Sequence, residues 1–218
     1  MHSLNPRDSL IKKFPACRWA VGVDEVGAGC LAGPLVAAAA LYDLSSDWVV
    51  SGEAPPCRIT DSKKLSDKQK LQASEWLFSK SSFRHVIKEL SPERIDEINI
   101  YWARMEALGL AALELIANIP KDESILIYID GPVLPPLLKN LSSNIQTHAE
   151  SKGDLKYFPV AAASILAKNF RDNLMGDLAK EFPVYGWESN VGYPSPSHKK
   201  ALREHGMTPW HRKSFSCL

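Results

Sequence analysis

The sequence is organised around residues 20–34, Ala-Val-Gly-Val-Asp-Glu-Val-Gly-Ala-Gly-Cys-Leu-Ala-Gly-Pro. Two adjacent acids, Asp24 and Glu25, end an apolar run that begins at Trp19, and a Gly27-Ala28-Gly29 turn follows at once. Carboxylates at the end of a strand, beside a backbone without bulky side chains, suit a divalent metal ion and a phosphate group. This stretch therefore predicts a phosphate-handling metal site at the edge of a sheet.

Length and composition are those of an ordinary globular chain. At 218 residues one domain is expected, with room for a small second lobe. The hydrophobic fraction of 45% allows a full core, and the net charge of +1 does not by itself indicate a nucleic-acid binder. The four cysteines are widely spaced and form no Cys-x-x-Cys pair, which argues against a zinc site or a disulfide framework and favours a reducing compartment.

The chain carries no pattern typical of a membrane or secreted protein. Its longest apolar stretch, from Cys30 to Tyr42, contains a Gly-Pro pair and is too short to span a bilayer. Residues 1–16 lack the apolar region of a signal peptide and read as a loose lead-in. We therefore expect a cytoplasmic protein without a membrane partner.

Hydrophobic patterning predicts strands that come first and then alternate with helices. Strands are expected over residues 18–26, 35–42, 83–90, 125–129 and 144–149, and helices over 66–80, 92–119, 159–181 and 197–205. Residues 43–56 and 186–196 are expected to be loops, and the long helix is expected to break near Glu97 to Asn99. Because the first strand is apolar with little alternation, we expect it at the centre of a mixed sheet in an α/β domain.

Four acids lie at predicted strand ends or in the loops beside them: Asp24, Glu25, Asp130 and Asp154. Phosphodiester hydrolysis by two metal ions needs several carboxylates at one point. Taken singly, an aspartate beside a glycine, such as Asp130 or Asp154, is more often a turn former. The Asp24-Glu25 pair is harder to explain that way, because buried adjacent carboxylates cost desolvation energy unless cations or donors offset it. Since neighbouring strand residues face opposite sides, we expect the strand to bend at Glu25.

Several basic and aromatic residues have two possible roles each. Lys63 and Lys64 beside Ser62 would hold phosphates or form a solvated loop, and Tyr193 would pack in its loop or stack on a sugar or base. A basic cluster near the C-terminus would contact a nucleic-acid backbone or form a plain charged helix face. This cluster comprises His198, Lys199, Lys200, Arg203, His211, Arg212 and Lys213.

An ordered set of short motifs runs from about Val21 to Phe215. It comprises Gly22-Val-Asp-Glu-Val-Gly27, Asp61-Ser-Lys-Lys-Leu-Ser66, Ile95-Asp-Glu-Ile-Asn-Ile100, Ile129-Asp-Gly131, Lys152-Gly-Asp154, Ala161-Ala-Ala-Ser-Ile-Leu-Ala-Lys168, Arg171-Asp172, Gly192-Tyr-Pro194, His211-Arg212 and Ser214-Phe215. Each motif alone is weak evidence for a protein family, but the whole set in this order is very specific. It resembles the type 2 ribonuclease H family, in particular bacterial ribonuclease HII.

The resemblance implies an RNase H-like mixed β-sheet flanked by helices, with a catalytic domain over residues 17–185 and a C-terminal helical segment over 186–218 packed on it. It implies a monomeric endoribonuclease that hydrolyses the RNA strand of RNA/DNA hybrids and incises 5′ to ribonucleotides embedded in duplex DNA. The catalytic residues, which would bind two Mg²⁺ or Mn²⁺ ions, would be Asp24, Glu25, Asp130 and Asp154. The substrate contacts would be Gly27, Ala28, Gly29, Ser62, Lys63, Ser164, Lys168 and Tyr193, with the glycine turn and the tyrosine reading the ribose 2′-hydroxyl.

Position 28 departs from the family pattern, which usually has arginine between the two glycines, whereas this chain has Ala28. The backbone amides of the turn survive the change, but a cationic contact near the RNA–DNA junction is lost. We therefore expect a reduced junction preference or rate with an intact metal site. The related ribonuclease HIII branch often lacks this arginine too, but it carries an extra N-terminal domain that the short lead-in before Cys17 is not expected to supply.

Two other functions compete with the hybrid nuclease. A catalytically impaired protein of the same fold would bind RNA/DNA hybrids without cutting them, and Ala28 leaves room for that reading. An α/β phosphatase or nucleotide hydrolase built on Asp24, Glu25 and Asp130 would act on small phosphomonoesters and need no duplex. A cleavage assay with Mg²⁺ or Mn²⁺ separates these functions.

Overall fold

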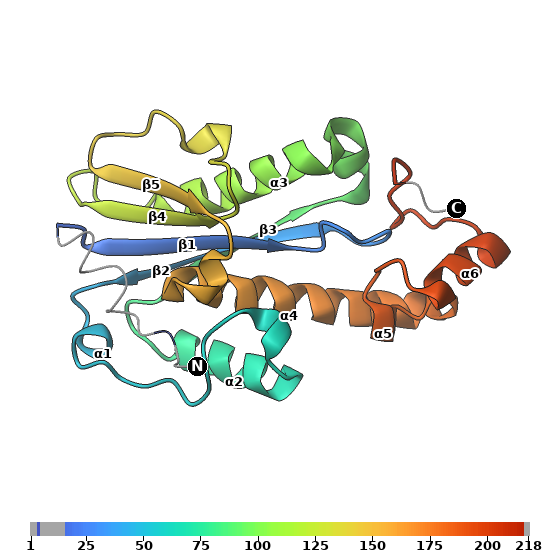
Figure 1. The fold of residues 1–218 in the computed structure, drawn as a ribbon, viewed down its shortest axis with the longest axis horizontal. Helices are drawn as coiled ribbons and strands as arrows, with labels where there is room; N and C mark the ends of the chain where they lie inside the picture. Colours follow the sequence, from blue (N-terminus) through green and yellow to red (C-terminus); the bar gives the residue numbers. More distant parts are fainter. Residues whose placement is uncertain (1–3, 5–15, 216–218) are drawn as a thin grey trace.

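A computed structural model describes residue 4 and residues 16–215 of the chain, so most of the predicted lead-in and Cys217 lie outside the described residues. Its centre is a five-stranded sheet of order β3-β2-β1-β4-β5 (Figure 1). The strands are β1 (Trp19–Val26), β2 (Leu35–Asp43), β3 (Arg84–Leu90), β4 (Ile125–Asp130) and β5 (Ile145–Glu150). β1, β2 and β3 are antiparallel neighbours, whereas β1, β4 and β5 run parallel. The predicted mixed sheet with the first strand at its centre is confirmed.

Helices cover both faces of the sheet (Figure 1). α3 (Pro92–Ile116) lies on one face, and α4 (Phe158–Glu181) lies on the other with α2 (Asp67–Phe78) beside it. Because side chains alternate along a strand, β1 contributes Val23 to the core under α3 and Ala20 to the core under α4. The result is a three-layer α/β/α domain with two hydrophobic cores.

Small residues let the first turns of α4 approach the sheet closely. A Cβ on Gly22 of β1 would lie 2.0 Å from the carbonyl carbon of Pro159, so only glycine fits at this crossing. The neighbouring strand β2 contributes a run of alanines, Ala37 to Ala40, that is fully buried. This close packing brings the N-terminal half of α4 beside the end of β1, where the two adjacent acids lie.

Local capping signals in the sequence set the helix starts. Ser66 and Gln69 form the predicted capping box at the start of α2, and the Ser91 hydroxyl accepts the Arg94 amide at the start of α3. Asn99 breaks α3 with a φ of 62°, as predicted. Its side-chain oxygen then accepts the amides of Tyr101 and Trp102 at 3.0 and 3.2 Å, so it caps the second part of the helix.

Two segments that we expected to be loops contain short helices, and both predictions were wrong in this respect. Residues 43–56 contain α1 (Asp47–Val50), and residues 186–196 contain α5 (Trp187–Asn190). Each helix has one tryptophan, Trp48 or Trp187, whose side chain is buried in a core. Tertiary packing of that ring stabilises a turn of helix for which the polar, glycine-containing local sequence gives no signal.

The C-terminal part packs against the last turns of α4 (Figure 1). It contains η4 (Pro183–Tyr185), α5 and α6 (Pro196–His205), which share a small separate core with residues of α4. Three further 3₁₀ turns, η1 (Ser62–Lys64), η2 (Pro136–Leu138) and η3 (Gly153–Leu155), lie in the connections. No helix among the described residues has both the length and the apolar character needed to cross a bilayer. The boundary between residues 185 and 186 stays a prediction.

Candidate active site

One cavity of about 500 Å³ lies at the C-terminal ends of the central parallel strands. All four predicted acids line it: Asp24 and Glu25 from β1, Asp130 from the end of β4, and Asp154 from η3. The ends of adjacent parallel strands meet at the same edge of a sheet, which is why residues so distant in sequence come together here. The remaining lining residues are Val26, Ser62, Lys63, Ser164, Lys168 and Tyr193.

Both acids of β1 reach this cavity although they are neighbours in a strand. Pairing of β1 with β2 continues without interruption through Val26, so no bulge turns Glu25 around. On its other side β1 pairs with β4 only as far as Val23. Beyond that point β4 ends at Asp130, and the unpaired edge of β1 leaves space for both carboxylates. We attribute their access to the end of β4 rather than to the expected bend in β1.

Burial and mutual repulsion dominate the electrostatics of the acids. The pKa of Asp24 lies well above its usual range, because the group is buried and because Glu25 and Asp130 repel its charge. Hydrogen bonds to Asp24 from Ser164 and from the Glu25 amide, the latter 2.7 Å long, act in the opposite direction. Burial and neighbouring carboxylates raise the pKa of Asp154 to about 6. The cavity therefore concentrates negative charge that a cation would neutralise.

Arg104 of α3 is a site residue that sequence reasoning missed. Its Nη2 lies 2.7 Å from Oε1 of Glu25, and the two side chains are 28% and 9% exposed. Burial raises the pKa of Glu25, and the charge of Arg104 opposes that rise. The sequence gives no local signal for this pair, because Arg104 is a single charge within the apolar stripe of a helix far along the chain.

The chemistry of the four acids fits a hard divalent cation. Carboxylate oxygens are the ligands that Mg²⁺ and Mn²⁺ prefer, and Oε2 of Glu25 is buried without a hydrogen-bond partner. Among the residues that the structure describes, no three acidic, histidine or cysteine side chains are already arranged to hold a metal ion. Mutual repulsion, together with the hold of Arg104 on Glu25, opposes a closer approach of the carboxylates. The donor set therefore suits the ions, without forming a finished coordination shell.

Serine and lysine donors form the wall of the cavity near η1 and α4. The hydroxyl oxygens of Ser62 and Ser164 lie 3.0 Å apart, and both side chains are buried. The charge of Lys63 lowers the pKa values of Glu25 and Asp154, so its ammonium group acts on the acids rather than only on solvent. Ser62 is buried, so the solvated-loop interpretation is wrong for that residue; Lys63 lines the cavity but is exposed, and its contact with phosphate stays a prediction.

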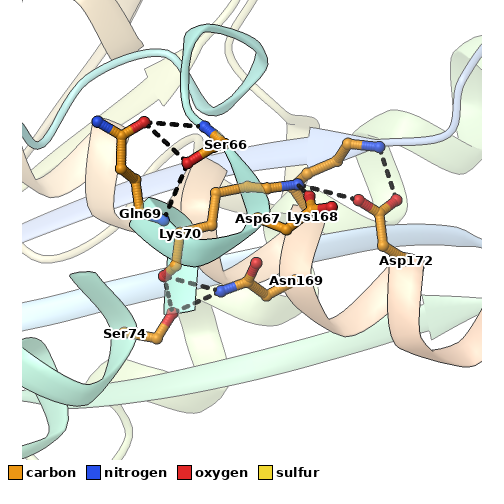
Figure 2. A network of polar contacts seen from close by, with 8 residues as sticks. All are labelled: Ser66, Asp67, Gln69, Lys70, Ser74, Lys168, Asn169 and Asp172. Atoms are coloured by element: carbon orange, nitrogen blue, oxygen red, sulfur yellow. Dashed lines mark hydrogen bonds and ion pairs between the residues drawn. The ribbon is translucent and has the colours of Figure 1, made fainter. Parts of the chain in front are cut away.

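Lys168 reaches the cavity from α4 as part of a charge network that also holds α2 (Figure 2). Its Nζ lies 2.6 Å from Oδ1 of Asp172, whose second oxygen is 3.2 Å from Nζ of Lys70. Lys70 is 4% exposed and also pairs with Asp67 at 2.8 Å. The Asn169 amide donates to the Lys70 carbonyl at 3.0 Å. The predicted contact Lys168 is therefore held in place by its neighbours, and Lys70 is a second residue that sequence reasoning missed.

The glycine turn lies beside the cavity and does not line it. Gly27 has a φ of 91°, and a Cβ there would meet Nε of Arg171 at 2.4 Å, so this position requires glycine. The Ala28 carbonyl accepts Nη1 of Arg212 at 3.1 Å. Gly29 is exposed, with open space where a Cβ would be, so its backbone is accessible to a ligand.

Tyr193 lines the cavity, and its loop is bonded to the segment that follows the glycine turn. The Gly192 carbonyl accepts the Leu31 amide at 2.8 Å. A Cβ on Gly192 would lie 2.3 Å from the Ala32 carbonyl oxygen, so the two backbones are in direct contact. The Cys30 thiol donates to the Val191 carbonyl of the same loop at 3.7 Å. The tyrosine is thus fixed relative to the turn, although the turn itself stands outside the cavity.

The basic cluster near the C-terminus contains both buried and exposed residues. His198, His211 and Arg212 are 0%, 1% and 0% exposed, so the reading that they contact a nucleic-acid backbone is wrong. Arg212 instead donates to the carbonyls of Gly33 and Ala28. The exposed members are Lys200, Arg203 and Lys213, with Lys199 partly buried.

A mixed sheet whose central strands end in an acidic cavity is the arrangement of an RNase H-like phosphodiester hydrolase. The comparisons with known proteins agree with this class. A model of the family described as Ribonuclease HII matches residues 21–217. The chain is 39% identical to a ribonuclease HII of Paracoccus denitrificans over 91% of this chain and 85% of that one. It therefore belongs to the ribonuclease HII family.

Solved structures extend the likeness to the fold. The ribonuclease H2 of Pyrococcus horikoshii matches with a TM-score of 0.72 and 27% identity, covering 91% of this chain and 94% of that one. A structure of Bst ribonuclease HIII in complex with Mn²⁺ has a TM-score of 0.69 over 97% of this chain and 71% of that one, but its 19% identity supports the fold alone.

Family membership confirms three predictions: the resemblance, the fold class and the class of enzyme. The protein is a metal-dependent endoribonuclease of the type 2 ribonuclease H class, a class that acts on RNA/DNA hybrids. The roles of individual residues stay predictions, and the geometry above is what supports them.

Proposed function

We propose that this chain hydrolyses the RNA strand of RNA/DNA hybrids and incises 5′ to ribonucleotides embedded in duplex DNA. The single observation that carries the proposal is the cavity in which all four acids meet the two serines, the two lysines and Tyr193. An RNA strand brings a phosphate and a 2′-hydroxyl to such a site, and the lining offers a group for each.

Asp24, Glu25, Asp130 and Asp154 would hold two divalent ions, Mg²⁺ or Mn²⁺. Ions of this kind stabilise negative charge on the attacking and leaving oxygens of a phosphodiester. The unpaired Oε2 of Glu25 supports the assignment, since a buried carboxylate oxygen without a donor is costly unless a cation approaches it. The reaction would yield 5′-phosphate and 3′-hydroxyl ends.

The remaining lining residues would bind and orient the strand. Lys63 and Lys168 carry positive charge at the cavity, and the hydroxyls of Ser62 and Ser164 are suitable donors to a phosphate oxygen. The exposed backbone of Gly29 and the ring of Tyr193 would read the ribose, together with Gly27 and Ala28. Since the turn stands outside the cavity, it would contact the sugar next to the scissile phosphate rather than the phosphate itself.

Ala28 would weaken recognition of the RNA–DNA junction by the glycine turn. Its methyl group supplies no charge, and the guanidinium of Arg212, which donates to the Ala28 carbonyl, is buried. We propose that the chain prefers junctions less strongly than relatives with arginine at this position, while its metal site is intact.

We further propose that the protein works as a monomer in the cytoplasm. One chain contributes all four acids and all the lining donors, so the cavity needs no second copy to complete it. The described cysteines, Cys17, Cys30 and Cys57, all carry free thiols, which is consistent with a reducing compartment.

The second candidate is a hybrid-binding protein with impaired catalysis. The ion pair between Arg104 and Glu25 favours it, because a carboxylate already neutralised by arginine binds a cation less strongly. A small-molecule phosphatase has no specific observation in its favour.

The test uses a labelled DNA duplex that contains one ribonucleotide, incubated with Mg²⁺ or with Mn²⁺. Incision 5′ to the ribonucleotide by the natural chain, and its loss in Asp130→Asn, would support the proposal. Metal-dependent binding without incision would favour the impaired binder. Release of phosphate from small phosphomonoesters, without cleavage of the duplex, would favour the phosphatase and refute the proposal.

A further inference from the structure

A buried cluster of rings lies beneath the Tyr193 loop. It consists of Tyr185 of η4, Trp187 of α5, His198 of α6 and His211 of the C-terminal segment, which are 4%, 0%, 0% and 1% exposed. The ring centroid of His211 lies 5.3 Å from the ring centroid of Trp187 and 5.3 Å from that of His198. Two imidazoles buried side by side without an acid between them need their polar atoms satisfied by other means.

The hydrogen-bond partners of His211 fix its tautomer. The backbone amide of Thr208 donates to Nδ1 of His211 at 2.9 Å. Because a backbone amide can only donate, Nδ1 carries no proton, and the neutral ring must carry its proton on Nε2. This Nε2 lies 3.1 Å from Nε2 of His198 and therefore donates to it.

The partners of His198 fix the opposite tautomer. The indole Nε1 of Trp187 donates to Nε2 of His198 at 3.1 Å, so this nitrogen is an acceptor twice over. The proton of the neutral His198 ring is then on Nδ1, which donates to the carbonyl oxygen of Tyr193 at 2.9 Å. One directed line of hydrogen bonds thus runs from Thr208 through both imidazoles to the backbone of Tyr193.

The complete line of hydrogen bonds requires both imidazole rings to be neutral. Burial lowers the pKa values of both histidines, and that of His211 falls to about 4, with a further contribution from His198. The charged groups that share a pocket wall with His211 are Glu93, Asp96, Glu97 and Lys213. Asp96 accepts the backbone amides of Lys213 and Ser214, so its carboxylate is already engaged.

Other bonds also hold this loop, and one of them reaches the Tyr193 carbonyl, which accepts the Ser195 amide at 2.8 Å. Nη1 of Arg171 donates to the Val191 carbonyl at 2.8 Å, and the Leu31 amide donates to the Gly192 carbonyl at 2.8 Å. The Ser195 amide bonds to Tyr193 within one local turn, whereas the imidazole pair ties the same carbonyl to α6 and to the C-terminal segment.

We propose that His198 and His211 are positioning residues for Tyr193, which they hold by its carbonyl so that its ring stays in the wall of the acidic cavity and reads the ribose. This inference rests on the function proposed above. Neither histidine touches the substrate; both act through the tyrosine.

Two variants of His211 separate this role from a general contribution to folding. His211→Asn keeps an acceptor for the Thr208 amide but removes the donor to His198, whereas His211→Gln places an amide donor near the position of Nε2. The measurement is fluorescence anisotropy at pH 7.5 with EDTA, using a DNA duplex that contains one ribonucleotide and the all-DNA duplex of the same sequence. Thermal unfolding under the same conditions shows whether each variant is folded.

We expect His211→Asn to reduce the preference for the ribonucleotide-containing duplex by about tenfold, because the variant loses one hydrogen bond of the line that positions Tyr193. His211→Gln should restore most of it. In a Tyr193→Ala background, His211→Asn should change the preference by less than about twofold, since the residue through which it acts is gone. NMR of ¹⁵N-labelled histidine side chains should show a proton on Nδ1 of His198 and on Nε2 of His211.

The outcomes distinguish the two levels of the proposal. A natural chain that binds both duplexes equally would overturn ribose reading itself, and the inference with it. A natural chain that prefers the ribonucleotide, with folded His211→Asn retaining that preference, would overturn the inference alone. Equal losses in the presence and absence of the Tyr193 side chain, or a charged imidazole at pH 7.5, would overturn it as well.

Discussion

The buried histidine pair should make this protein less stable as the pH falls. His211 is 1% exposed, and burial lowers its pKa from 6.5 to about 4. In the unfolded chain the imidazole binds a proton below pH 6.5, whereas in the folded protein it resists protonation until about pH 4. Between these values the unfolded state holds more protons, so the free energy of unfolding falls as the pH falls.

The size of the effect follows from the two pKa values. On lowering the pH from 7.5 to 5, this one group should remove about 2 kcal/mol from the free energy of unfolding, approaching about 3 kcal/mol near pH 4. Urea unfolding of the natural chain and of His211→Gln at several pH values isolates the histidine, because the carboxylates titrate alike in both. The difference between the two proteins should narrow as the pH falls.

A constant difference between the two proteins across pH 7.5 to 4.5 would refute this reasoning. It would mean that His211 titrates alike in the folded and unfolded chains, and therefore that it does not lie in a closed, neutral hydrogen-bonded pair. Above pH 7.5 both proteins should show no further change from this residue, since the imidazole is neutral in both states.

Four other perturbations test the site and the fold. Asp130→Asn should reduce cleavage of a ribonucleotide-containing duplex by about 100-fold or more, since several kcal/mol of charge stabilisation depend on the acids, while anisotropy shows retained duplex binding. Ala28→Arg should raise cleavage at a single ribonucleotide about tenfold over the natural chain through a new charged contact; an unchanged rate would count against a junction role for position 28. Arg104→Met should lower the free energy of unfolding in EDTA by about 2 kcal/mol, because the buried carboxylate of Glu25 loses its partner, and added Mn²⁺ should raise its Tm more than that of the natural chain. Gly22→Ala should cost about 3 kcal/mol or more in urea unfolding, since its Cβ would lie 2.0 Å from Pro159.

Those parts of the fold that depend on local chemistry could be predicted from the sequence. The Ser66 and Ser91 caps, and the break at Asn99, each use a side chain that bonds to backbone within three residues. The meeting of Asp24 with Asp130 also follows from a simple rule, because apolar strands that run parallel end at the same edge of the sheet.

Other features could not be predicted because they depend on residues that meet only after folding. Arg104 and Glu25 form an ion pair across two layers of the structure, and Lys70 pairs with Asp172 between two helices that are distant in sequence. The one-turn helices at Trp48 and Trp187 exist because a core accepts each ring. In all of these cases the local sequence is compatible with several outcomes, and the partner decides among them.

The C-terminal basic residues show why residue type alone misleads about a nucleic-acid enzyme. A guanidinium or imidazole near the end of a nuclease is easily assigned to the phosphate backbone, yet Arg212 donates three hydrogen bonds to two carbonyls of the chain itself, those of Gly33 and Ala28. Desolvation lowers the pKa of Arg212 to about 10, so burial has a cost that only a structural purpose explains. Its bonds fix the backbone of the glycine turn from Ala28 to Gly33, while the histidine pair fixes the loop of Tyr193. In this protein the buried Arg212 and the neutral histidine pair therefore hold the backbone of the proposed ribose-reading elements. The described members of the cluster that are exposed and so accessible to a phosphate are Lys200, which pairs with Glu204 at 3.8 Å, Arg203 and Lys213.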